Sequence, residues 1–207
     1  MKSTLRSLRE LGEDVVLAPE RWVAVSGVGE GVPLGELVIE RRERADLLDG
    51  AVVLDTTHAR DGVLDIASAV RAAPSAKSAK KRALAGDLVV SRLRPYLRQI
   101  ALVHPCAIDA AGGRELALSS EFYVLAARHP DDDLAFLLPF LLGAQAQAIL
   151  AAAQEGGHHP RVPRSSLMAL RVPLDVVEAR DRRSREVIEA LDALYRATLR
   201  YQELLGR

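Results

Sequence analysis

The sequence predicts an α+β fold in which a mixed sheet and its packed helices are followed by one long C-terminal helix. The segment 84–103 holds two apolar, β-branched runs joined by a basic turn, which is the pattern of two paired strands. The segment 134–154 is rich in leucine and alanine and apolar nearly all round, as in a buried helix. The segment 176–205 has no glycine or proline and repeats apolar residues every three or four positions, which indicates a long amphipathic helix.

Length and composition indicate a globular chain with a substantial core. Its 207 residues fit one large domain, or one domain with an appendage, and 49% of them are hydrophobic. No apolar run approaches the roughly 18 residues of a membrane span. The single cysteine, Cys106, excludes an internal disulfide, so we expect a protein of the reducing cytoplasm.

The first 48 residues are predicted to contain two helices, a strand and their connections. Met1–Leu11 has leucines spaced three apart and fits a short amphipathic helix, while its interspersed charges do not fit a signal peptide. Arg21–Ser26 is alternating and β-branched, so we expect a strand with Trp22 in the core. The glycine-rich segment 27–35 is expected to be a loop, and it lacks the third glycine of a dinucleotide-binding fingerprint. The segment 34–48 should pass through a short helix into a polar connection.

Further strands and an acidic helix start are expected on either side of the 84–103 pair. Gly50–Ile66 has the pattern of a strand, a loop and a short strand, with Asp61-Gly62 at the turn. Leu116–Ala127 is expected to be strand-like, with successive side chains on opposite faces. The acidic run 129–133 should cap the helix over 134–154, in which Pro139 would separate the first turn from the rest.

The C-terminal part contains the longest helical signal. One helical turn should start at Arg164, and Ala169–Pro173 should form a short strand. A helix over 176–205 would be about 45 Å long at 1.5 Å per residue, which exceeds a small domain, so its far end should project. We therefore divide the chain into a body, 1–174, and a helix, 175–207. We expect the apolar stripe of the helix to meet a partner helix rather than its own domain. The stripe comprises Val187, Ile188, Leu191, Leu194, Tyr195, Thr198, Tyr201 and Leu205.

Positive charge is concentrated in one window of a chain whose net charge is zero. Residues 71–98 include eight basic side chains and a single acidic one, Asp87. The segments 1–70 and 99–155 are net negative, and 156–207 is net positive. If the positive segments meet in space they form a cationic face suited to phosphate; the alternative is a solvated loop beside an ordinary hairpin. The eight basic residues are Arg71, Lys77, Lys80, Lys81, Arg82, Arg92, Arg94 and Arg98.

The sequence lacks the common catalytic and metal-binding motifs. No lysine follows a glycine, which excludes a P-loop, and the Gly-x-Ser-x-Gly, His-Glu-x-x-His and Cys-x-x-Cys patterns are absent. A proline separates His104 from Cys106 and restricts chelation, and the adjacent His158 and His159 should point apart. Asp131–Asp133 fits a helix start better than an ion site. We therefore expect no catalytic residue, no cofactor and no metal, with Cys106 as a small buried hydrophobe.

Six short motifs follow one another between about residue 22 and residue 205. They are Trp22 with Leu34-Gly35-Glu36, Val53-Leu54-Asp55 through Gly62, Gly86–Arg92, Ser119–Leu125, Gly156–Val162 and Leu167–Leu174. In this order they resemble a target-recognition domain of type I restriction–modification specificity subunits, and the shared order of the motifs carries the resemblance.

The chain departs from that family at two points. The Glu-Gln pair that usually opens the family's long helix is absent at Val177–Arg180. The family's full subunit has two recognition domains and two long helices, whereas this chain has room for one of each. The resemblance is therefore to a half-subunit, which we expect to self-associate through its C-terminal helix into a homodimer.

The resemblance implies a curved, mixed sheet and a protein that reads double-stranded DNA for an adenine DNA methyltransferase subunit, with a restriction nuclease subunit as a further candidate partner. The alternative is a scaffold protein that keeps the fold without DNA readout, which the zero net charge leaves open; a divergent nuclease using the 131–133 acids is more remote. We expect phosphate contacts from Lys77, Lys80, Lys81 and Arg82, and positions nearer the bases for Arg92, Arg94, His158, His159 and Arg161. Arg98 and Arg164 complete the expected DNA-binding set.

Overall fold

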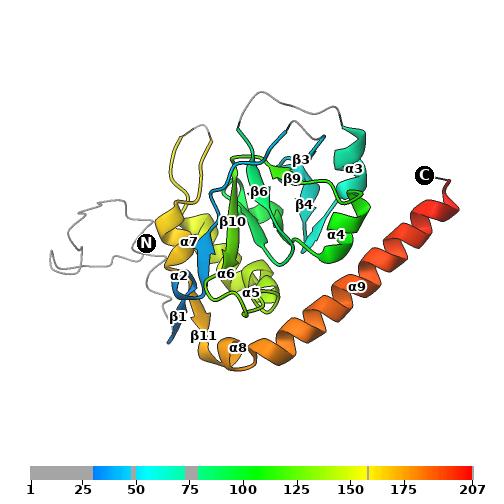
Figure 1. Cartoon of the computed structure of the whole chain (residues 1–207). Helices are drawn as coiled ribbons and strands as arrows, with labels where there is room; N and C mark the ends of the chain where they lie inside the picture. The colour runs from blue at the N-terminus through cyan, green and yellow to red at the C-terminus, as the bar shows by residue number, and fades with distance from the viewer. Residues whose placement is uncertain (1–29, 48–49, 73–78, 158, 207) are drawn as a thin grey trace, which may run out of the picture.

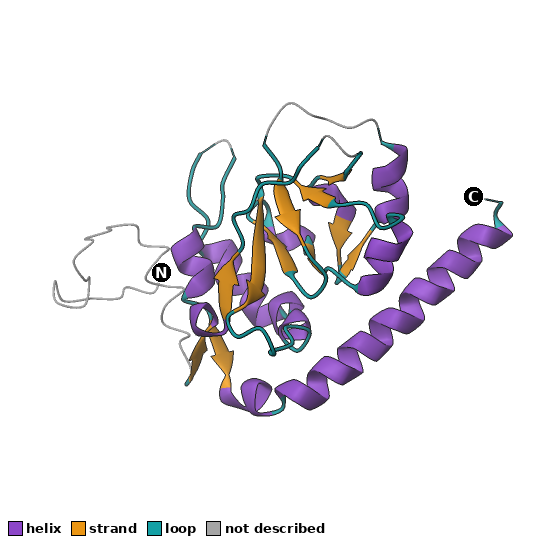
Figure 2. Cartoon of the chain, viewed as in Figure 1, coloured by secondary structure: helices purple, strands orange, loops and turns teal. Residues whose placement is uncertain are grey.

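The computed structural model describes residues 30–47, 50–72, 79–157 and 159–206. Figure 1 shows a body of strands and helices, along one side of which a long helix runs outward to the C-terminus. The predicted α+β class is confirmed, and Figure 2 shows the strands gathered inside with helices around them. The predicted helix Met1–Leu11 and strand Arg21–Ser26, with Trp22, lie outside the described residues.

A four-stranded antiparallel sheet forms the centre of the body. Its strands, in spatial order, are β2 (Val38–Glu40), β10 (Phe122–Ala127), β7 (Leu88–Ser91) and β8 (Ile100–Leu102). All positions of β7 and β8 are buried, which explains why these strands read as continuous apolar runs rather than as alternating ones. The predicted pairing across the basic turn is confirmed, with Val89 opposite Ala101.

A second, mixed sheet of three strands lies beside the first. It consists of β3 (Val52–Leu54), β9 (Leu116–Leu118) and β6 (Lys81–Ala83), with β3 parallel and β6 antiparallel to β9. The stretch 116–127 therefore contains two strands in different sheets. The chain turns between them because Ser119 accepts two hydrogen bonds, one on its hydroxyl from the Glu121 N–H and one on its carbonyl from the Phe122 N–H.

Two strand pairs complete the sheets. The predicted Asp61-Gly62 turn is confirmed: it joins β4 (Ala59–Arg60) to β5 (Val63–Leu64), and both turn residues have positive φ. The segment 27–35 was predicted as a loop, but its described part forms β1 (Gly31–Pro33), which pairs with β11 (Arg171–Pro173). That partner lies far along the chain, so local sequence did not reveal it. Three short helices lie next to these strands in the chain: η2 (Thr56–His58) before β4, α2 (Leu34–Leu37) after β1 and α7 (Arg164–Met168) before β11.

The helix predicted over 134–154 is in fact two helices, α5 (Leu137–Leu142) and α6 (Ala144–Ala152). The break falls at Gly143, whose backbone is extended, and Pro139 lies inside α5. Gln147 stabilises the break because its side-chain amide donates to the carbonyl of Leu141 at 2.6 Å. The acidic run does not cap this helix directly; Asp133 instead accepts from the Ala135 N–H at 2.7 Å.

The remaining helices flank the body. They are α3 (Ile66–Arg71), α4 (Pro105–Ala110), α8 (Leu174–Glu178) and α9 (Arg180–Leu204). The predicted long C-terminal helix is thus present, with a break after α8. No helix in the described part of the chain is both long and apolar enough to span a membrane.

The predicted apolar stripe of the C-terminal helix is divided between two environments. Leu191 and Tyr195 are buried, and Val187 and Ile188 pack on the core, so this part contacts its own domain. For these residues the expectation of a partner helix was wrong. The outer residues are exposed, and Figure 1 shows the C-terminal end of α9 extending away from the body. These outer stripe residues are Leu194, Thr198, Tyr201 and Leu205.

Candidate nucleic-acid interface

Tyr123 on the central strand β10 organises a group of cations. Its hydroxyl donates to the carbonyl of Val162 at 2.8 Å, which fixes the ring. The Lys81 ammonium lies 5.7 Å and the Arg92 guanidinium 5.6 Å from the ring centroid, within the range of cation–π attraction. We define the Tyr123 cluster as Tyr123, Lys81, Arg92, Arg161, Arg164, Arg42, Glu40 and Glu121.

Glu40, at the end of β2, holds three of these cations. Its carboxylate lies 3.1 Å from Lys81 Nζ, 3.0 Å from Arg164 Nε and 3.2 Å from Arg42 Nε. Burial raises the pKa of Glu40, but the hydrogen bond and charge of Lys81, together with the two arginines, outweigh burial and leave the pKa below its ordinary value. Glu40 is therefore an ionised anchor that fixes where the cations stand.

Glu121 is the second anchor and follows the Ser119 turn. Arg161 binds it through two hydrogen bonds of 2.9 and 2.7 Å, a bidentate arrangement, and Arg92 Nε stands 3.8 Å away. The hydrogen bonds from Arg161 lower the pKa of Glu121. Arg92 Nε is buried and has no hydrogen-bond partner, so it remains a free donor beside the tyrosine face.

The cluster keeps a positive surplus and unused donors. Five cations surround two carboxylates, which leaves a net charge of +3. Arg42 and Arg164 contact Glu40 through Nε, so their terminal nitrogens make no hydrogen bond within the described part of the chain. Both residues also line a surface hollow with Ile39, Arg128 and Met168. Fixed guanidinium groups with free N–H bonds are suited to a phosphate or another anion.

The turn between β7 and β8 adjoins the cluster. Arg94 and Arg98 both have left-handed backbone conformations and flank η3 (Pro95–Leu97), which leaves Tyr96 67% exposed. Arg98 Nε binds Asp61 at 2.8 Å, whereas the exposed Arg94 has no ion pair with any described residue. A left-handed non-glycine residue costs about 1 kcal/mol or more, so the turn is held open against its local preference.

The backbone joins this turn to the loop between α6 and α7. The backbone carbonyl of Arg92 accepts a 2.8 Å hydrogen bond from the Val162 N–H, and Leu93 forms an antiparallel β-bridge with Arg161. The loop itself closes where Glu155 and Arg161 exchange hydrogen bonds of 2.9 and 2.8 Å. The two net-positive segments, 71–98 and 156–207, therefore meet in space at this point. Their meeting was the condition for a cationic face.

The predicted DNA-binding residues are not all in one place. Lys81, Arg92, Arg161 and Arg164 belong to the Tyr123 cluster, and Arg94, Arg98 and His159 adjoin it. Arg82 is directed elsewhere on β6, toward Glu43 and Glu115 at 3.7 Å each. Lys80 is only 8% exposed, so its side chain is mostly beneath the surface. Lys77 and His158 lie outside the described residues.

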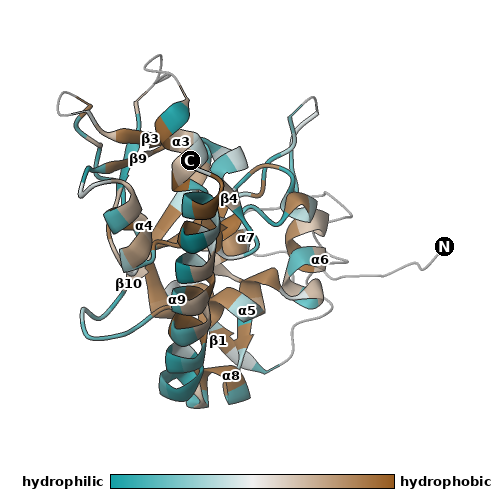
Figure 3. Ribbon diagram, turned by 90° about the vertical axis from the view of Figure 1, so that its right-hand side faces the viewer, coloured by the Kyte–Doolittle hydropathy of each residue, from teal (hydrophilic) through white to brown (hydrophobic). Residues whose placement is uncertain are grey.

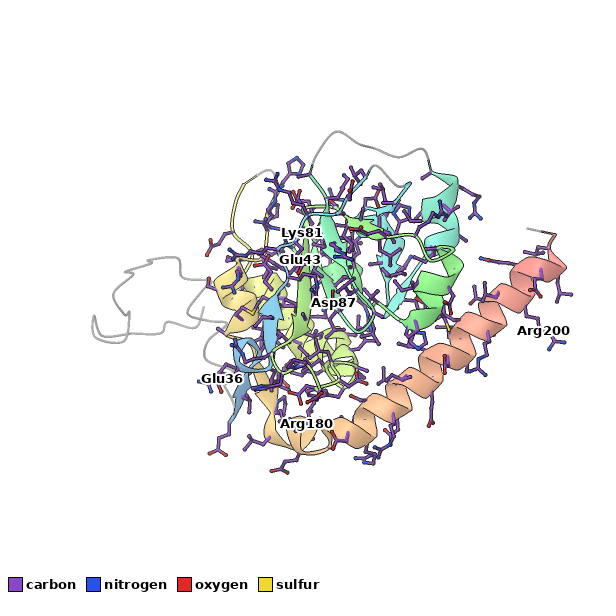
Figure 4. The ribbon with its side chains drawn as sticks, viewed as in Figure 1. Glu36, Glu43, Lys81, Asp87, Arg180 and Arg200 are labelled. Carbon is purple, nitrogen blue, oxygen red and sulfur yellow. The ribbon has the colours of Figure 1, made fainter. Side chains whose placement is uncertain are left out.

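Sequence reasoning missed the residues that assemble the cluster: Glu40, Glu121, Tyr123 and Arg42. Glu121 and Tyr123 lie in the Ser-Ser-Glu-Phe-Tyr segment, Glu121 in the turn that precedes β10 and Tyr123 in the strand itself. Glu40 and Lys81 were separated by 41 positions and gave no local signal. Figure 4 labels Lys81, Glu43 and Asp87 in the strand region of the body and Arg180 and Arg200 toward the two ends of α9.

Comparison with known proteins finds similarity in structure alone. No protein-family model matches the chain, and no curated protein matches it. A solved chain from a structure describing complex assembly and conformational transition of the type I R-M system superposes with a TM-score of 0.52 and 22% identity, over 84% of this chain and 44% of that one. The HsdS subunit from Thermoanaerobacter tengcongensis gives a TM-score of 0.48 at 22% identity over the same shares. The chain spans less than half the length of either solved chain, and the first likeness shows a shared fold.

Proposed function

We propose that the chain is a sequence-specific DNA-recognition subunit that directs an adenine DNA methyltransferase to its target site and has no catalysis of its own. The observation that carries this proposal is the Tyr123 cluster, with its five fixed cations, free guanidinium donors and adjoining strained turn. The shared fold with a chain of a type I R-M structure supports it. A restriction nuclease subunit is a further partner under this proposal.

The cluster supports a division of labour between phosphate and base contacts. Arg42 and Arg164, with free terminal nitrogens, are suited to phosphate, and Lys77, Lys80 and Arg82 remain proposed phosphate contacts. Arg94 and the exposed Tyr96 project from the turn and are the best placed to enter a groove. Arg161 would first have to exchange its bond to Glu121, so we assign it to positioning. Arg92, Arg98, His158 and His159 complete the proposed interface.

The alternative is a scaffold protein that keeps the fold without reading DNA. The observation in its favour is that all four arginines of the cluster already have a carboxylate partner. Zero net charge also weakens the long-range attraction to DNA. Duplex binding measured at low and moderate salt separates the two functions, because a DNA-reading subunit binds with a strong salt dependence and a scaffold protein does not bind.

The test uses Arg164→Ala, with Arg200→Ala on α9 as the matched control. Removing Arg164 leaves Glu40 paired with Lys81 and Arg42, so the fold should persist. We expect weaker binding to all duplexes and a salt slope reduced by about one in Arg164→Ala, and no change in the control. Lys81→Ala is less informative, because Lys81 also donates to the Phe122 carbonyl at 2.7 Å. Unchanged binding and slope in Arg164→Ala would exclude this residue from the interface.

Sequence preference and the partner enzyme are tested separately. Arg94→Ala should retain affinity for nonspecific duplex and lose discrimination between sites, by about 1 to 3 kcal/mol per base contact. Methylation mapping of the host genome with and without the gene should show one adenine-methylated motif disappear. An unchanged methylation map would favour the scaffold alternative.

A further inference from the structure

A second polar cluster lies where α4 meets α9, two elements that run side by side in Figure 1. His104 precedes α4 as its N-cap, Cys106 lies in the first turn of α4, and Asp192 comes from α9. Cys106 Sγ is 3.5 Å from Asp192 Oδ1, and His104 Nε2 is 3.7 Å from the same oxygen. All three potential ligand atoms lie within 4.8 Å of one another.

The imidazole nitrogen that faces this cluster has no hydrogen-bond partner. His104 is 2% exposed, and its Nε2 is buried without a hydrogen bond, because 3.7 Å to Asp192 is too long for one. The ring is held in place by stacking on Tyr195, with centroids 5.4 Å apart and planes inclined by 16°. A buried polar atom without a partner destabilises the fold because it has lost its hydrogen bond to water, so a ligand at this nitrogen would be favoured.

We propose that His104, Cys106 and Asp192 form a three-ligand site for a divalent ion of the Zn²⁺ type, with water as the fourth ligand. Zinc in proteins binds imidazole nitrogen, thiolate sulfur and carboxylate oxygen in a tetrahedron. Bonds of about 2.3 Å to sulfur and 2.0 Å to nitrogen and oxygen place tetrahedral S and O atoms about 3.5 Å apart, and N and O about 3.3 Å apart. The observed separations of 3.5 and 3.7 Å therefore need little adjustment.

The surroundings leave the required atoms available. Arg196 pairs with the other carboxylate oxygen, Asp192 Oδ2, at 3.3 Å, which turns Oδ1 toward the cluster. Burial and the neighbouring Asp192 raise the pKa of Cys106, with Asp109 adding to the effect and Arg196 opposing it. The ion-free site therefore contains a thiol, and a bound cation would supply the positive charge that a thiolate needs.

Binding of the ion has a defined proton balance. The Cys106 N–H donates to His104 Nδ1 over a long 3.3 Å, so the ion-free ring carries its proton on Nε2. As Nε2 and Sγ bind the metal, the ring proton moves to Nδ1 and the thiol proton passes to solvent. One proton is released per ion, and no oxidant or reductant takes part. The 3.3 Å hydrogen bond from the Cys106 N–H to His104 Nδ1 is lost, and the bond from Nε2 to the metal replaces it.

An ion at this position would fasten α9 to the body. Cys106 and Asp192 are 86 positions apart, and Asp192 lies three positions before Tyr195, the last of the buried residues of α9. From the sequence, only His104 and Cys106 could be seen as neighbours, and on that basis we expected no metal. The third ligand comes from a long-range contact and changes that assessment.

The experiment is a titration of the full metal-free chain with Co²⁺, followed by displacement with Zn²⁺. We expect one equivalent of Co²⁺ to produce a thiolate-to-metal absorption band, and one equivalent of Zn²⁺ to abolish it. Cys106→Ser should remove the band, and Asp192→Asn should weaken Zn²⁺ affinity by about tenfold or more. Two matched controls outside the cluster, Glu189→Gln on the exposed side of α9 and His129→Gln, should bind like the wild type.

Hydrogen exchange gives a second, independent reading. Zn²⁺ should slow amide exchange in α9 around residues 188–196 in the wild type and leave it unchanged in Asp192→Asn, whose metal-free fold is verified by circular dichroism. Absence of stoichiometric binding would overturn the site. Wild-type Zn²⁺ affinity in both Asp192→Asn and Cys106→Ser would do the same, because it would place the ion at other side chains. Neither outcome depends on whether the chain binds DNA.

Discussion

Individual residues of the six short sequence motifs mostly build the framework of the fold. Asp87 is 3% exposed and accepts two hydrogen bonds from Arg41, at 2.8 and 3.1 Å, and a third from the Leu84 N–H at 2.8 Å. It thereby ties the segment after β2 to the tight turn that precedes β7. Gly35 is required for packing in a similar way, because a Cβ there would lie 3.3 Å from both the Cβ and the carbonyl oxygen of Met168.

Asp87→Asn should destabilise the fold strongly. The amide keeps the shape of the carboxylate but cannot accept from both nitrogens of Arg41 and from the Leu84 N–H as a charged group does. Breaking a buried ion pair from one side typically costs about 3 kcal/mol or more. We expect a loss of that size in the free energy of unfolding, measured by urea denaturation. The exposed Asp109→Asn is the control, and equal stability of the two variants would contradict the role assigned to Asp87.

Glu121 should make the stability of the protein depend on acidity. Arg161 lowers the pKa of its carboxyl in the folded state, while the unfolded chain takes up the proton near the ordinary value of about 4.3. The stabilisation is therefore present above that value and is lost as the pH falls toward the folded pKa. Between about pH 5 and 3, urea midpoints of the wild type should fall more steeply than those of Glu121→Gln. The exposed Glu36→Gln serves as the control and should follow the wild type.

The sequence identified the clustered basic residues but did not reveal which acidic residues they contact. It located Arg92, Arg161 and Arg164 as functional candidates because clustered arginines are visible in a linear chain. It did not reveal Glu40 or Glu121 as their partners, since an acidic residue is identified as an anchor only when its distant cations are known. The motif order nevertheless led to the right fold, because the short motifs contain the turn and packing residues.

Among the elements, α9 shows how one helix combines two environments. Its inner part is attached at buried points: the Ser184 hydroxyl accepts from the Phe136 N–H at 3.2 Å, Leu191 is buried, and the Tyr195 hydroxyl accepts from the Leu64 N–H at 3.0 Å. These three residues are seven and four positions apart and so lie along one face. Figure 3 shows this helix crossing the face of the body with apolar and polar residues along its length.

Tyr195→Phe tests this attachment with a minimal change. Phenylalanine keeps the ring that stacks on His104 but leaves the buried Leu64 N–H without a partner. Such a loss costs about 1 to 3 kcal/mol in the free energy of unfolding. Tyr201→Phe is the matched control, because Tyr201 is 62% exposed and its change should stay within about 0.5 kcal/mol. Equal effects of both substitutions in urea denaturation would show that the Tyr195 hydroxyl does not anchor α9.

The type of a helix or strand was predictable where its hydrophobic pattern was long, but the residues at which elements begin and end were not. The strands β7 and β8 and the C-terminal helix follow directly from apolar runs and from the absence of glycine and proline. The break at Gly143 was not predicted, because proline is the stronger helix breaker and the break was expected at Pro139. Pro139 instead lies in the first turn of α5, where proline is tolerated. The separation of β9 from β10 was missed because the turn is made by side-chain and backbone bonds of Ser119 rather than by glycine.

At the scale of the whole molecule, the sequence could not show which surfaces remain open. Periodicity marked one continuous stripe on the C-terminal helix, but the body covers only its inner half. From Leu194 outward the exposed stripe positions repeat at intervals of four, three and four, the spacing of a helix-pairing seam. The side chains that remain for a partner are Leu194, Thr198, Tyr201 and Leu205, with Leu204 beside them.

We propose that a second copy of the chain covers this outer stripe. Only about three helical turns are free, and a stable interface usually buries about 800 Å² per partner, so the dimer should be weak and depend on concentration. Sedimentation equilibrium of the wild type should show a monomer–dimer transition, and Leu194→Glu with Tyr201→Glu should remain monomeric, because four charges would be brought into one seam. Glu189→Gln, on α9 outside the stripe, should associate like the wild type. A wild type that is monomeric at every concentration would leave the stripe for another protein, such as the proposed methyltransferase partner, whereas an undiminished dimer in the double variant would place self-association on another surface.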